Sequence, residues 1–385
     1  MARKNVVILG STGSIGINTL NVVKRFPSYF KVLGLTAYSN FKVLEKQIRE
    51  FSPRYVAVNS PGIDYLKKRI GPGVKLFDVE TDLATIAAFD DVDIVVIAIS
   101  GSAALRPFLS AVQNGKTVAT ANKEALVVAG DIIMNQARQH KAKIIPIDSE
   151  QSAIFQCLEG RDHRDIKTVY LTASGGPLWS IQRAKFDKLS VAQILDHPRW
   201  KMGKRITVDS ATLMNKGFEV IEAKWLFDLK VERIQVVIHP QAIIHSMVGF
   251  KDGSIIAQLG ITDMRLPIQY ALAYPQRLDS GLKELDFFAL KNLSFCRPDL
   301  KKFPALALAI AVAKSGGTLP SVLNAADECA VQAFLAERIS FTQIYKVVEK
   351  VVRRHRGKNN PSLDDIFSSD CWAREEAESI ISSLG

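Results

Sequence analysis

The sequence predicts an α/β protein: an N-terminal Rossmann-like, doubly wound parallel sheet, then a central α+β domain and a small C-terminal helical bundle. Three observations support this fold class. Residues 5–36 read as strand, glycine-rich loop, helix and strand, which is the pattern of a β-α-β unit. Short apolar runs then alternate with helical patterns up to about residue 147. Beyond residue 304 only helical periodicity remains.

The N-terminal sheet is predicted from short buried runs separated by helical stretches. A first helix ends near Lys24, and further helices are expected at 42–50, 103–114 and 131–140. The strands are expected at 5–9, 31–36, 54–58, 92–99, 116–120 and 143–147. Such alternation is typical of a parallel sheet, so we assign residues 1–149 to the Rossmann-like domain.

The pattern changes after residue 150, which we take as the start of an α+β domain covering 150–275. One helix is expected to begin after Ser210 and to run to about Asp228. Strands are expected at 169–172, 233–239, 246–250 and 254–259. A proline-containing linker is expected at 276–303, and a helical domain at 304–385 with helices at 304–315, 322–337, 341–355 and 371–383.

Composition and charge restrict the class of protein. The 385 residues carry a formal net charge of +11, and the basic residues are spread along the chain, so we favour a phosphorylated small molecule over nucleic acid as the partner. The four cysteines lie far apart without a C-x-x-C pair, which is typical of a reducing compartment. We expect no leader peptide, because a strand is predicted from residue 5, and no apolar stretch reaches about 20 residues, so we expect a cytoplasmic protein without a membrane span.

The loop that follows the first strand has the composition of a phosphate-binding turn. It reads Gly10-Ser11-Thr12-Gly13-Ser14-Ile15-Gly16; glycines permit a tight turn, and the N–H groups of the following helix face an anion. An NAD site usually carries an acidic residue after the second strand. This chain has Ser39 and Asn40 there, with Lys42 close by, so we infer NADP(H).

Three carboxylates are candidates for a cation site. Asp148 and Glu150 follow directly on the predicted strand 143–147, and as positions i and i+2 of a strand they would point to the same side. Glu219 follows later in the chain. With no cysteine and no clear histidine among them, these hard oxygen ligands favour Mg²⁺ or Mn²⁺ over Zn²⁺.

A second group of polar residues suits a phosphate. Ser174 lies in a small turn after a predicted strand, and Ser210 precedes a helix that carries Asn215, Lys216 and Glu219. Residues i and i+4 share one helix face, so Asn215 and Glu219 point the same way, and Glu222 lies one turn past Glu219. The alternative is an amphipathic surface helix capped by Ser210, but that explanation leaves the two serine-containing turns unexplained.

Six motifs in order resemble the 1-deoxy-D-xylulose 5-phosphate reductoisomerase family over nearly the whole chain. Besides the Gly10–Gly16 loop, they are Ala121-Asn-Lys-Glu124, Asp148-Ser-Glu150, Ser174-Gly-Gly-Pro177, His197-Pro-x-Trp200-x-Met202-Gly203 and Ser210-Ala-Thr-Leu-Met-Asn-Lys-Gly-Phe-Glu219. The resemblance implies conversion of 1-deoxy-D-xylulose 5-phosphate to 2-C-methyl-D-erythritol 4-phosphate in isoprenoid synthesis. It also implies NADPH, a divalent cation (Mg²⁺, Mn²⁺ or Co²⁺), and a cytoplasmic bacterial homodimer.

The same resemblance assigns roles residue by residue. It implies that Asp148, Glu150 and Glu219 hold the metal and take part in catalysis, and that Lys123 bridges cofactor and substrate as a catalytic group. Further cofactor contacts would come from Asn122, Glu124 and Gly203. Substrate contacts would come from Ser149, Glu150, Ser174, Ser210, Asn215, Lys216 and Glu219, and a flap with His197, Trp200 and Met202 would close over the site.

The chain departs from the family pattern at four places. Gln151 stands where a histidine is common, Ala173 where a glycine is common, and Arg199 where an asparagine is frequent. Tyr38-Ser39 replaces a glycine-containing turn. None of these changes removes a catalytic group.

Two other functions are compatible with parts of the sequence. A two-domain dehydrogenase of the homoserine or diaminopimelate type would need no carboxylate triad, so a chelator would not inhibit it. A dinucleotide-sensing regulatory protein would show no turnover, and its clustered serine, lysine and carboxylate residues would then be accidental.

Overall fold

The computed structural model describes residues 3–196 and 203–384. Contacts between residues divide the chain into two compact units. Unit 1 consists of Met1–Ala125, Asp131–Ser152 and Asp263–Leu282, and unit 2 of Leu126–Gly130, Ala153–Thr262 and Lys283–Gly385. The finer division at residues 149, 275 and 303 stays a prediction.

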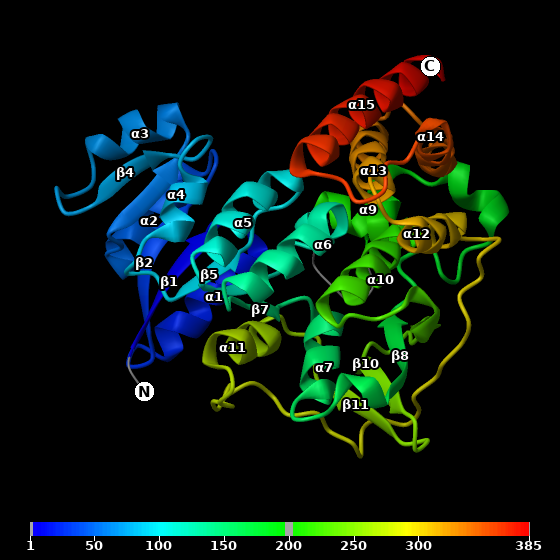
Figure 1. The fold of residues 1–385 in the computed structure, drawn as a ribbon, viewed down its shortest axis with the longest axis horizontal. Helices are drawn as coiled ribbons and strands as arrows, with labels where there is room; N and C mark the ends of the chain where they lie inside the picture. The colour runs from blue at the N-terminus through cyan, green and yellow to red at the C-terminus, as the bar shows by residue number, and fades with distance from the viewer. Residues whose placement is uncertain (1–2, 197–202, 385) are drawn as a thin grey trace. The chain divides into compact units, whose positions relative to one another are not determined.

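Unit 1 is built on a parallel sheet, which confirms the predicted Rossmann-like class (Figure 1). Within the described residues this sheet has seven strands in the order β4-β3-β2-β1-β5-β6-β7. Its strands are β1 (Lys4–Leu9), β2 (Phe30–Thr36), β3 (Tyr55–Val58), β4 (Lys75–Asp78), β5 (Ile94–Ile97), β6 (Thr117–Thr120) and β7 (Lys143–Pro146). The direction of the strand order changes at β1, and ligands of such sheets bind at the carboxyl ends of the strands beside this point.

Helices connect these strands, as parallel pairing requires. They are α1 (Ser14–Arg25), α2 (Phe41–Phe51), α3 (Ser60–Lys67), α4 (Leu83–Ala88), α5 (Leu105–Gln113) and α6 (Glu124–Gln139). A further helix of unit 1, α11 (Arg265–Ala273), comes later in the chain, after β11. Residues Val6 to Leu9 of β1 are completely buried, because a parallel strand is covered on both faces. The sequence did not predict β4, α3, α4 or α11.

Unit 2 contains a smaller mixed sheet in the order β11-β10-β8-β9. Its strands are β8 (Ile166–Ala173), β9 (Ile234–Ile238), β10 (Ile244–Phe250) and β11 (Ile255–Leu259). The β8–β9 pair is parallel and the other two pairs are antiparallel. All four lie where the sequence predicts strands, with ends shifted by up to three residues.

The helices of unit 2 include the predicted C-terminal bundle, in which α13 lies beside α15 (Figure 1). They are α8 (Val191–Leu195), α9 (Lys204–Thr212), α10 (Met214–Leu226), α12 (Pro304–Ser315), α13 (Leu319–Leu335), α14 (Phe341–Arg354) and α15 (Leu363–Ser382). Helix α10 packs closely on α12: a Cβ atom added to Gly217 would lie 2.3 Å from the Cβ atom of Ala309. Glycine at this position therefore lets the two helices approach each other.

Two local predictions are wrong. Glu150 does not follow Asp148 along an extended strand, because β7 ends at Pro146 and helix α7 (Ser149–Leu158) begins at Ser149. Ser210 does not precede a single helix either. It lies in α9, and Leu213, with a φ of 62°, separates α9 from α10. A leucine in the left-handed region is uncommon, and no glycine or proline marks the break.

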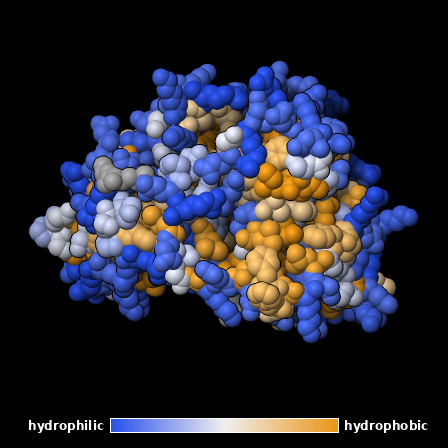
Figure 2. All heavy atoms as spheres, turned by 90° about the horizontal axis from the view of Figure 1, so that it is seen from below, coloured by the Kyte–Doolittle hydropathy of each residue, from blue (hydrophilic) through white to orange (hydrophobic). Residues whose placement is uncertain are grey.

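The surface of unit 2 carries several large hydrophobic side chains. Figure 2 shows a broad hydrophobic area on one face of the molecule. The exposed large hydrophobic residues of unit 2 are Ile255 in β11 and Phe287, Phe288, Phe295 and Leu300 in the segment 283–303. In residues 3–196 and 203–384, no helix combines the length and apolar character that crossing a membrane requires.

Candidate active site

The glycine-rich loop of unit 1 has the geometry of an anion cradle. Gly10 adopts a φ of 91°, and an added Cβ atom would lie 2.7 Å from the carbonyl oxygen of Ala98. At Gly16 an added Cβ atom would lie 2.3 Å from the carbonyl oxygen of Gly10. Helix α1 begins immediately after Gly13, so its free N–H groups face the loop. The residues present therefore fit a pyrophosphate group.

Ser11 holds this loop in place through buried hydrogen bonds. Its side chain is completely buried. Its hydroxyl donates to Oε1 of Gln47 at 2.7 Å, and Nε2 of Gln47 donates to the Ser11 carbonyl at 2.9 Å. The hydroxyl thus fixes the loop against α2. Thr12 is half-buried, whereas Gly13 and Ser14 are exposed, which leaves their N–H groups accessible to a ligand.

The turn after β2 is exposed, as a site for the adenosine end of a cofactor requires. Ser39 and Asn40 are both exposed, and the Asn40 side chain makes no capping bond to α2. Tyr38 is 62% exposed, and its hydroxyl donates to Glu80 at 2.9 Å. This hydrogen bond raises the pKa of Tyr38. No pattern in the sequence pointed to Glu80, because it follows β4, a strand that was not predicted.

The motif at 122–124 joins two loops at the ends of neighbouring strands. Asn122 donates through Nδ2 to the carbonyl oxygens of Ile99 and Gly101, both at 3.0 Å. Glu124 accepts from the N–H of Gly101 at 3.2 Å and from Asn122 at 3.0 Å. Lys123 is buried, and its Nζ lies 2.8 Å from Oδ2 of Asp148. Asn122 and Glu124 therefore shape the loops, while Lys123 presents its charge to a carboxylate.

The three predicted carboxylates come together. Asp148, Glu150 and Glu219 each offer one oxygen atom, and these atoms all lie within 4.8 Å of one another. Asp148 accepts from the N–H of Glu150 at 3.2 Å, and Ser149 donates through its hydroxyl to Glu150 at 2.6 Å. A set of hard oxygen donors at this spacing fits a divalent cation such as Mg²⁺. Asp148 and Glu150 are placed by the start of helix α7 and not by the alternation of side chains along a strand.

The first half of the predicted phosphate pocket is a turn that packs on α9. Gly175 and Gly176 have φ angles of 90° and 70°, and the Ser174 hydroxyl accepts from the N–H of Gly176 at 3.2 Å. A Cβ atom added to Gly176 would lie 2.4 Å from the carbonyl oxygen of Ser210. Ser174 and Ser210 therefore belong to segments that are in direct contact.

Helix α10 supplies the second half of this pocket. Asn215 donates through Nδ2 to Oε1 of Glu219 at 2.6 Å, and Lys216 forms an ion pair with Oε2 of the same carboxylate. Met214 and residues 216–223 are buried, so the alternative of an amphipathic surface helix is wrong. Its ammonium and carboxylate groups lie inside the protein rather than in water.

Part of the predicted flap lies outside the described residues. This applies to His197, Arg199, Trp200 and Met202. Gly203, the last residue of the motif, is exposed and precedes α9 as its N-cap.

His245 in β10 is a buried histidine that the sequence analysis did not single out. Burial lowers the pKa of His245, and the charge of Lys216 lowers it further. In the sequence it is a single histidine inside an apolar strand, and that pattern does not distinguish a functional histidine from a core histidine.

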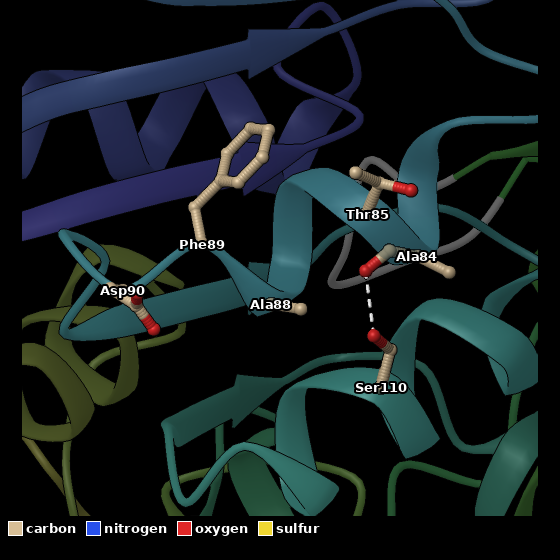
Figure 3. Close-up of a pocket in the computed structure, with 6 residues that line it drawn as sticks. All are labelled: Ala84, Thr85, Ala88, Phe89, Asp90 and Ser110. Carbon is tan, nitrogen blue, oxygen red and sulfur yellow. Dashed lines mark hydrogen bonds between the residues drawn. The ribbon is translucent and has the colours of Figure 1, made fainter.

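A separate hollow in unit 1 is lined mainly by small side chains. It measures about 450 Å³ and is lined by Ala84, Thr85, Ala88, Phe89, Asp90 and Ser110 (Figure 3). The Ser110 hydroxyl donates to the carbonyl oxygen of Ala84 at 2.6 Å. None of these lining residues belongs to the predicted site, and they offer a ligand a single carboxylate and no cation.

Comparisons with known families give one consistent result. The chain matches the family "1-deoxy-D-xylulose 5-phosphate reductoisomerase" over residues 6–130. It also matches that family's C-terminal domain over residues 144–227 and the "DXP reductoisomerase C-terminal domain" over residues 259–376.

Two relatives illustrate the similarity in sequence, and both are 1-deoxy-D-xylulose 5-phosphate reductoisomerases. That of Thermoanaerobacter pseudethanolicus is 49% identical over 375 residues, covering 97% of this chain and 98% of the relative. That of Chlorobium phaeobacteroides is 49% identical over 380 residues, covering 98% and 99%.

Solved structures agree with the fold. A crystal structure of DOX-P reductoisomerase in complex with NADPH, fosmidomycin and magnesium has a TM-score of 0.95 and 40% identity, covering 99% of both chains. The enzyme from Zymomonas mobilis in complex with NADPH has a TM-score of 0.93 and 39% identity, covering 99% of this chain and all of the other.

Proposed function

Because the chain belongs to the 1-deoxy-D-xylulose 5-phosphate reductoisomerase family, we propose that its site residues carry out the steps of that reaction as follows. The enzyme rearranges 1-deoxy-D-xylulose 5-phosphate and reduces the product with NADPH to 2-C-methyl-D-erythritol 4-phosphate, in the non-mevalonate route to isoprenoids. It uses NADPH and a divalent cation. One observation carries the residue assignment: the carboxylate oxygens of Asp148, Glu150 and Glu219 lie within 4.8 Å of one another.

The carboxylate group is proposed to hold the cation. A bound divalent cation supplies Lewis acidity to the carbonyl and adjacent hydroxyl oxygens of the substrate while its carbon skeleton is rearranged. Lys123 holds Asp148 in place through its ion pair, and Lys216 does the same for Glu219. Ser149 donates a hydrogen bond to Glu150 and so orients that carboxylate. Ser149 is also proposed to contact the substrate. Mg²⁺ suits this donor set, and Mn²⁺ and Co²⁺ are proposed as substitutes.

The pocket of Ser174, Ser210, Asn215 and Lys216 is proposed to hold the phosphate of the substrate. Hydroxyl and amide groups donate hydrogen bonds in fixed directions, and the buried ammonium supplies the charge. The phosphate does not react, so its binding energy orients the reacting atoms. His197, Trp200 and Met202 are proposed to close over the substrate and exclude water.

NADPH supplies the hydride for the reduction, and unit 1 is proposed to hold it. The N–H groups of the Gly10–Gly16 loop bind the pyrophosphate, and Ser39 and Asn40 donate to the 2′-phosphate. Asn122 and Glu124 shape the loops beside the nicotinamide end, and Gly203 contacts the cofactor from the start of α9. Ser11 contributes through its main chain because its hydroxyl is bonded to Gln47.

The assembly is proposed to be a homodimer in the bacterial cytoplasm. Unit 2 exposes the large hydrophobic side chains of Ile255, Phe287, Phe288, Phe295 and Leu300, and a second copy of the chain would cover them. The relatives are bacterial, and all four cysteines are free. Light scattering should give twice the 42.5 kDa of the chain, whereas a monomer at micromolar concentration would contradict this proposal.

A direct assay tests the proposed function. Purified protein with 1-deoxy-D-xylulose 5-phosphate, NADPH and Mg²⁺ should oxidise NADPH, and excess chelator should abolish the reaction until Mg²⁺ is restored. Turnover that is unaffected by chelator would contradict the metal assignment. The absence of turnover with this substrate, together with turnover of homoserine, would favour the dehydrogenase alternative.

A further inference from the structure

A buried arginine connects the phosphate pocket to the C-terminal bundle. Arg205 lies in the first turn of α9, two residues after Gly203. Its side chain is only 19% exposed, although long cationic side chains usually reach into solvent. A guanidinium group with so little access to water requires acceptors inside the protein, because an unpaired buried charge strongly destabilises a fold.

The bundle provides these acceptors from helix α13. Nη2 of Arg205 donates to Oδ1 of Asn324 at 3.0 Å, and Nη1 lies 3.5 Å from Oε1 of Glu328. Within α9, Nε lies 3.8 Å from Oδ2 of Asp209. The planar guanidinium can meet acceptors in several directions at once, which a lysine cannot do with the same geometry. Arg205 therefore holds α9 to α13 through one hydrogen bond and one ion pair.

The same network continues away from α9. The second oxygen of Glu328 lies 2.9 Å from Nη2 of Arg374 in α15, and Nε of Arg374 lies 2.6 Å from Asp370. Arg374 therefore holds Glu328 in place, and these two ion pairs join it to α13 and α15 rather than to α9. It offers a matched comparison, because it is an arginine of the same network that shares one carboxylate with Arg205.

The other end of α9 carries the phosphate pocket. Ser210 lies in its last turn, and its carbonyl oxygen would be 2.4 Å from a Cβ atom added to Gly176. The turn that presents Ser174 therefore rests directly on the main chain of α9. Any rotation or shift of α9 moves Ser210 and displaces this turn, because packed main-chain atoms leave no free space.

We propose that Arg205 is a positioning residue for the phosphate pocket: it anchors α9 to Asn324 and Glu328 so that Ser210 and Ser174 face the substrate phosphate. This proposal rests on the proposed function of those two serines. It gives the C-terminal bundle a role in substrate recognition, although the bundle itself supplies none of the proposed ligands. Arg205 acts through the helix and does not contact the substrate.

The experiment compares Arg205→Gln, Arg205→Lys and Arg374→Gln in the full-length protein. In Arg205→Gln, the KM for 1-deoxy-D-xylulose 5-phosphate and the inhibition constant of inorganic phosphate should both rise about 10- to 100-fold, the scale of a misplaced binding group. The Kd for NADPH should rise less than these two constants, because Gly203 is the only one of the proposed cofactor residues that adjoins α9. Arg205→Lys should restore part of the phosphate affinity, because it keeps the charge.

The comparison variant separates positioning from stability. Arg374→Gln should lower the unfolding temperature as much as Arg205→Gln does, yet raise the inhibition constant of phosphate far less, because Arg205 keeps its hydrogen bond to Asn324. Equal effects of both variants on phosphate, or unchanged phosphate inhibition in Arg205→Gln, would overturn the proposal. If Arg205→Gln does not fold, Asn324→Ala removes a single acceptor and should raise the same two constants. Failure of the parent protein to turn over the substrate would instead contradict the proposed function.

Discussion

The glycine-rich loop of unit 1 and helix α10 of unit 2 present polar groups to their proposed ligands in opposite ways. The loop uses main-chain N–H groups, and its glycines are required because neighbouring main-chain atoms leave no room for a Cβ atom at Gly10 and Gly16. Helix α10 uses charged side chains that are buried: Lys216 is 4% exposed and Glu219 is 1% exposed. The loop needs only seven consecutive residues, whereas the helix needs partners from the rest of unit 2.

The two regions differ in the free energy that each one costs the folded state. A glycine loop gives up conformational entropy, about 0.5–1 kcal/mol per glycine relative to alanine. Buried charges cost several kcal/mol each unless paired and hydrogen-bonded. Local sequence therefore determines the loop, while distant packing determines whether α10 can hold its charges. Variants in the two regions should fail in different ways.

The largest effect is expected for Glu219→Gln. This change keeps the shape of the side chain but removes one of three charges that would hold the cation, so turnover should fall about a thousandfold, the scale of several kcal/mol of lost charge stabilisation. The half-saturating Mg²⁺ concentration should rise at least about 100-fold. Steady-state NADPH oxidation at increasing Mg²⁺ measures both quantities.

Glu222→Gln is the matched control for this variant. Glu222 is completely buried and lies one turn further along α10, but it is not part of the three-carboxylate group. Its Mg²⁺ dependence should therefore equal that of the parent. The metal assignment would be wrong if Glu222→Gln, and not Glu219→Gln, changed the response to Mg²⁺.

An intermediate effect is expected for Gly16→Ala in the cofactor loop. The new Cβ atom would meet the carbonyl oxygen of Gly10 at 2.3 Å and Cα of Ser11 at 2.5 Å, so the main chain must move. We expect a loss of about 1–3 kcal/mol in the free energy of unfolding, as for an overpacked core, and about 10- to 100-fold weaker NADPH binding. Calorimetric titration and urea unfolding measure these changes.

Gly13→Ala sharpens the same test. Gly13 has an ordinary φ of −81°, and its added Cβ atom would meet only the Gly10 carbonyl oxygen, at 3.5 Å. Its unfolding free energy should change by less than about 0.5 kcal/mol, while NADPH binding should still weaken because Gly13 lies in the proposed pyrophosphate loop and is exposed. Equal destabilisation by Gly16→Ala and Gly13→Ala would contradict this explanation, because only the Cβ atom at Gly16 is expected to clash with the main chain.

The smallest effect is expected at Asp327 in α13. This carboxyl group is completely buried, and burial, together with the negative charge of Asp209, raises its pKa well above the ordinary value. A raised pKa in the folded state gives stability that is fully present at low pH and is lost as the pH rises through that pKa. Asp327→Asn should remove this loss and should therefore be more stable than the parent at pH 8.

Urea unfolding between pH 4 and pH 8 measures this dependence. The advantage of Asp327→Asn should grow as the pH rises, and an advantage that is constant with pH would contradict it. Asp365→Asn provides the opposite sign. Asp365 is half-buried, and hydrogen bonds from Lys358 and Ser362 lower its pKa to about 2. Its contribution is present above pH 4 and is lost as the pH falls toward 2, so unfolding between pH 2 and pH 4 measures it.

Sequence patterns predicted the parts of the molecule that depend on neighbours in the chain. The alternation of strands and helices and the Gly10–Gly16 loop follow from local sequence, and so does the predicted bundle. The carboxylate trio was also predicted, although Asp148 and Glu150 reach their positions through the start of α7 rather than along a strand. The break at Leu213 was missed because only tertiary packing holds a leucine at a φ of 62°.

Other features could not be predicted because they join distant segments. Arg205 and Glu328 lie 123 residues apart and meet only when α9 packs on α13. Glu80 becomes a partner of Tyr38 only through the unpredicted strand β4. In both cases the residues have no local pattern that distinguishes them from ordinary surface charges, so the interaction appears only with the fold.

The contact between Gly217 and Ala309 restricts how this enzyme can escape an inhibitor. A compound that binds Asn215 and Lys216 meets a helix in which Met214 and residues 216–223 are already buried, and Gly217 cannot enlarge without pushing α12 away. Substitutions on α10 that weaken the compound would therefore also damage packing. We expect resistance to arise in more exposed segments that also contact the compound, where side chains can change at little cost to the fold.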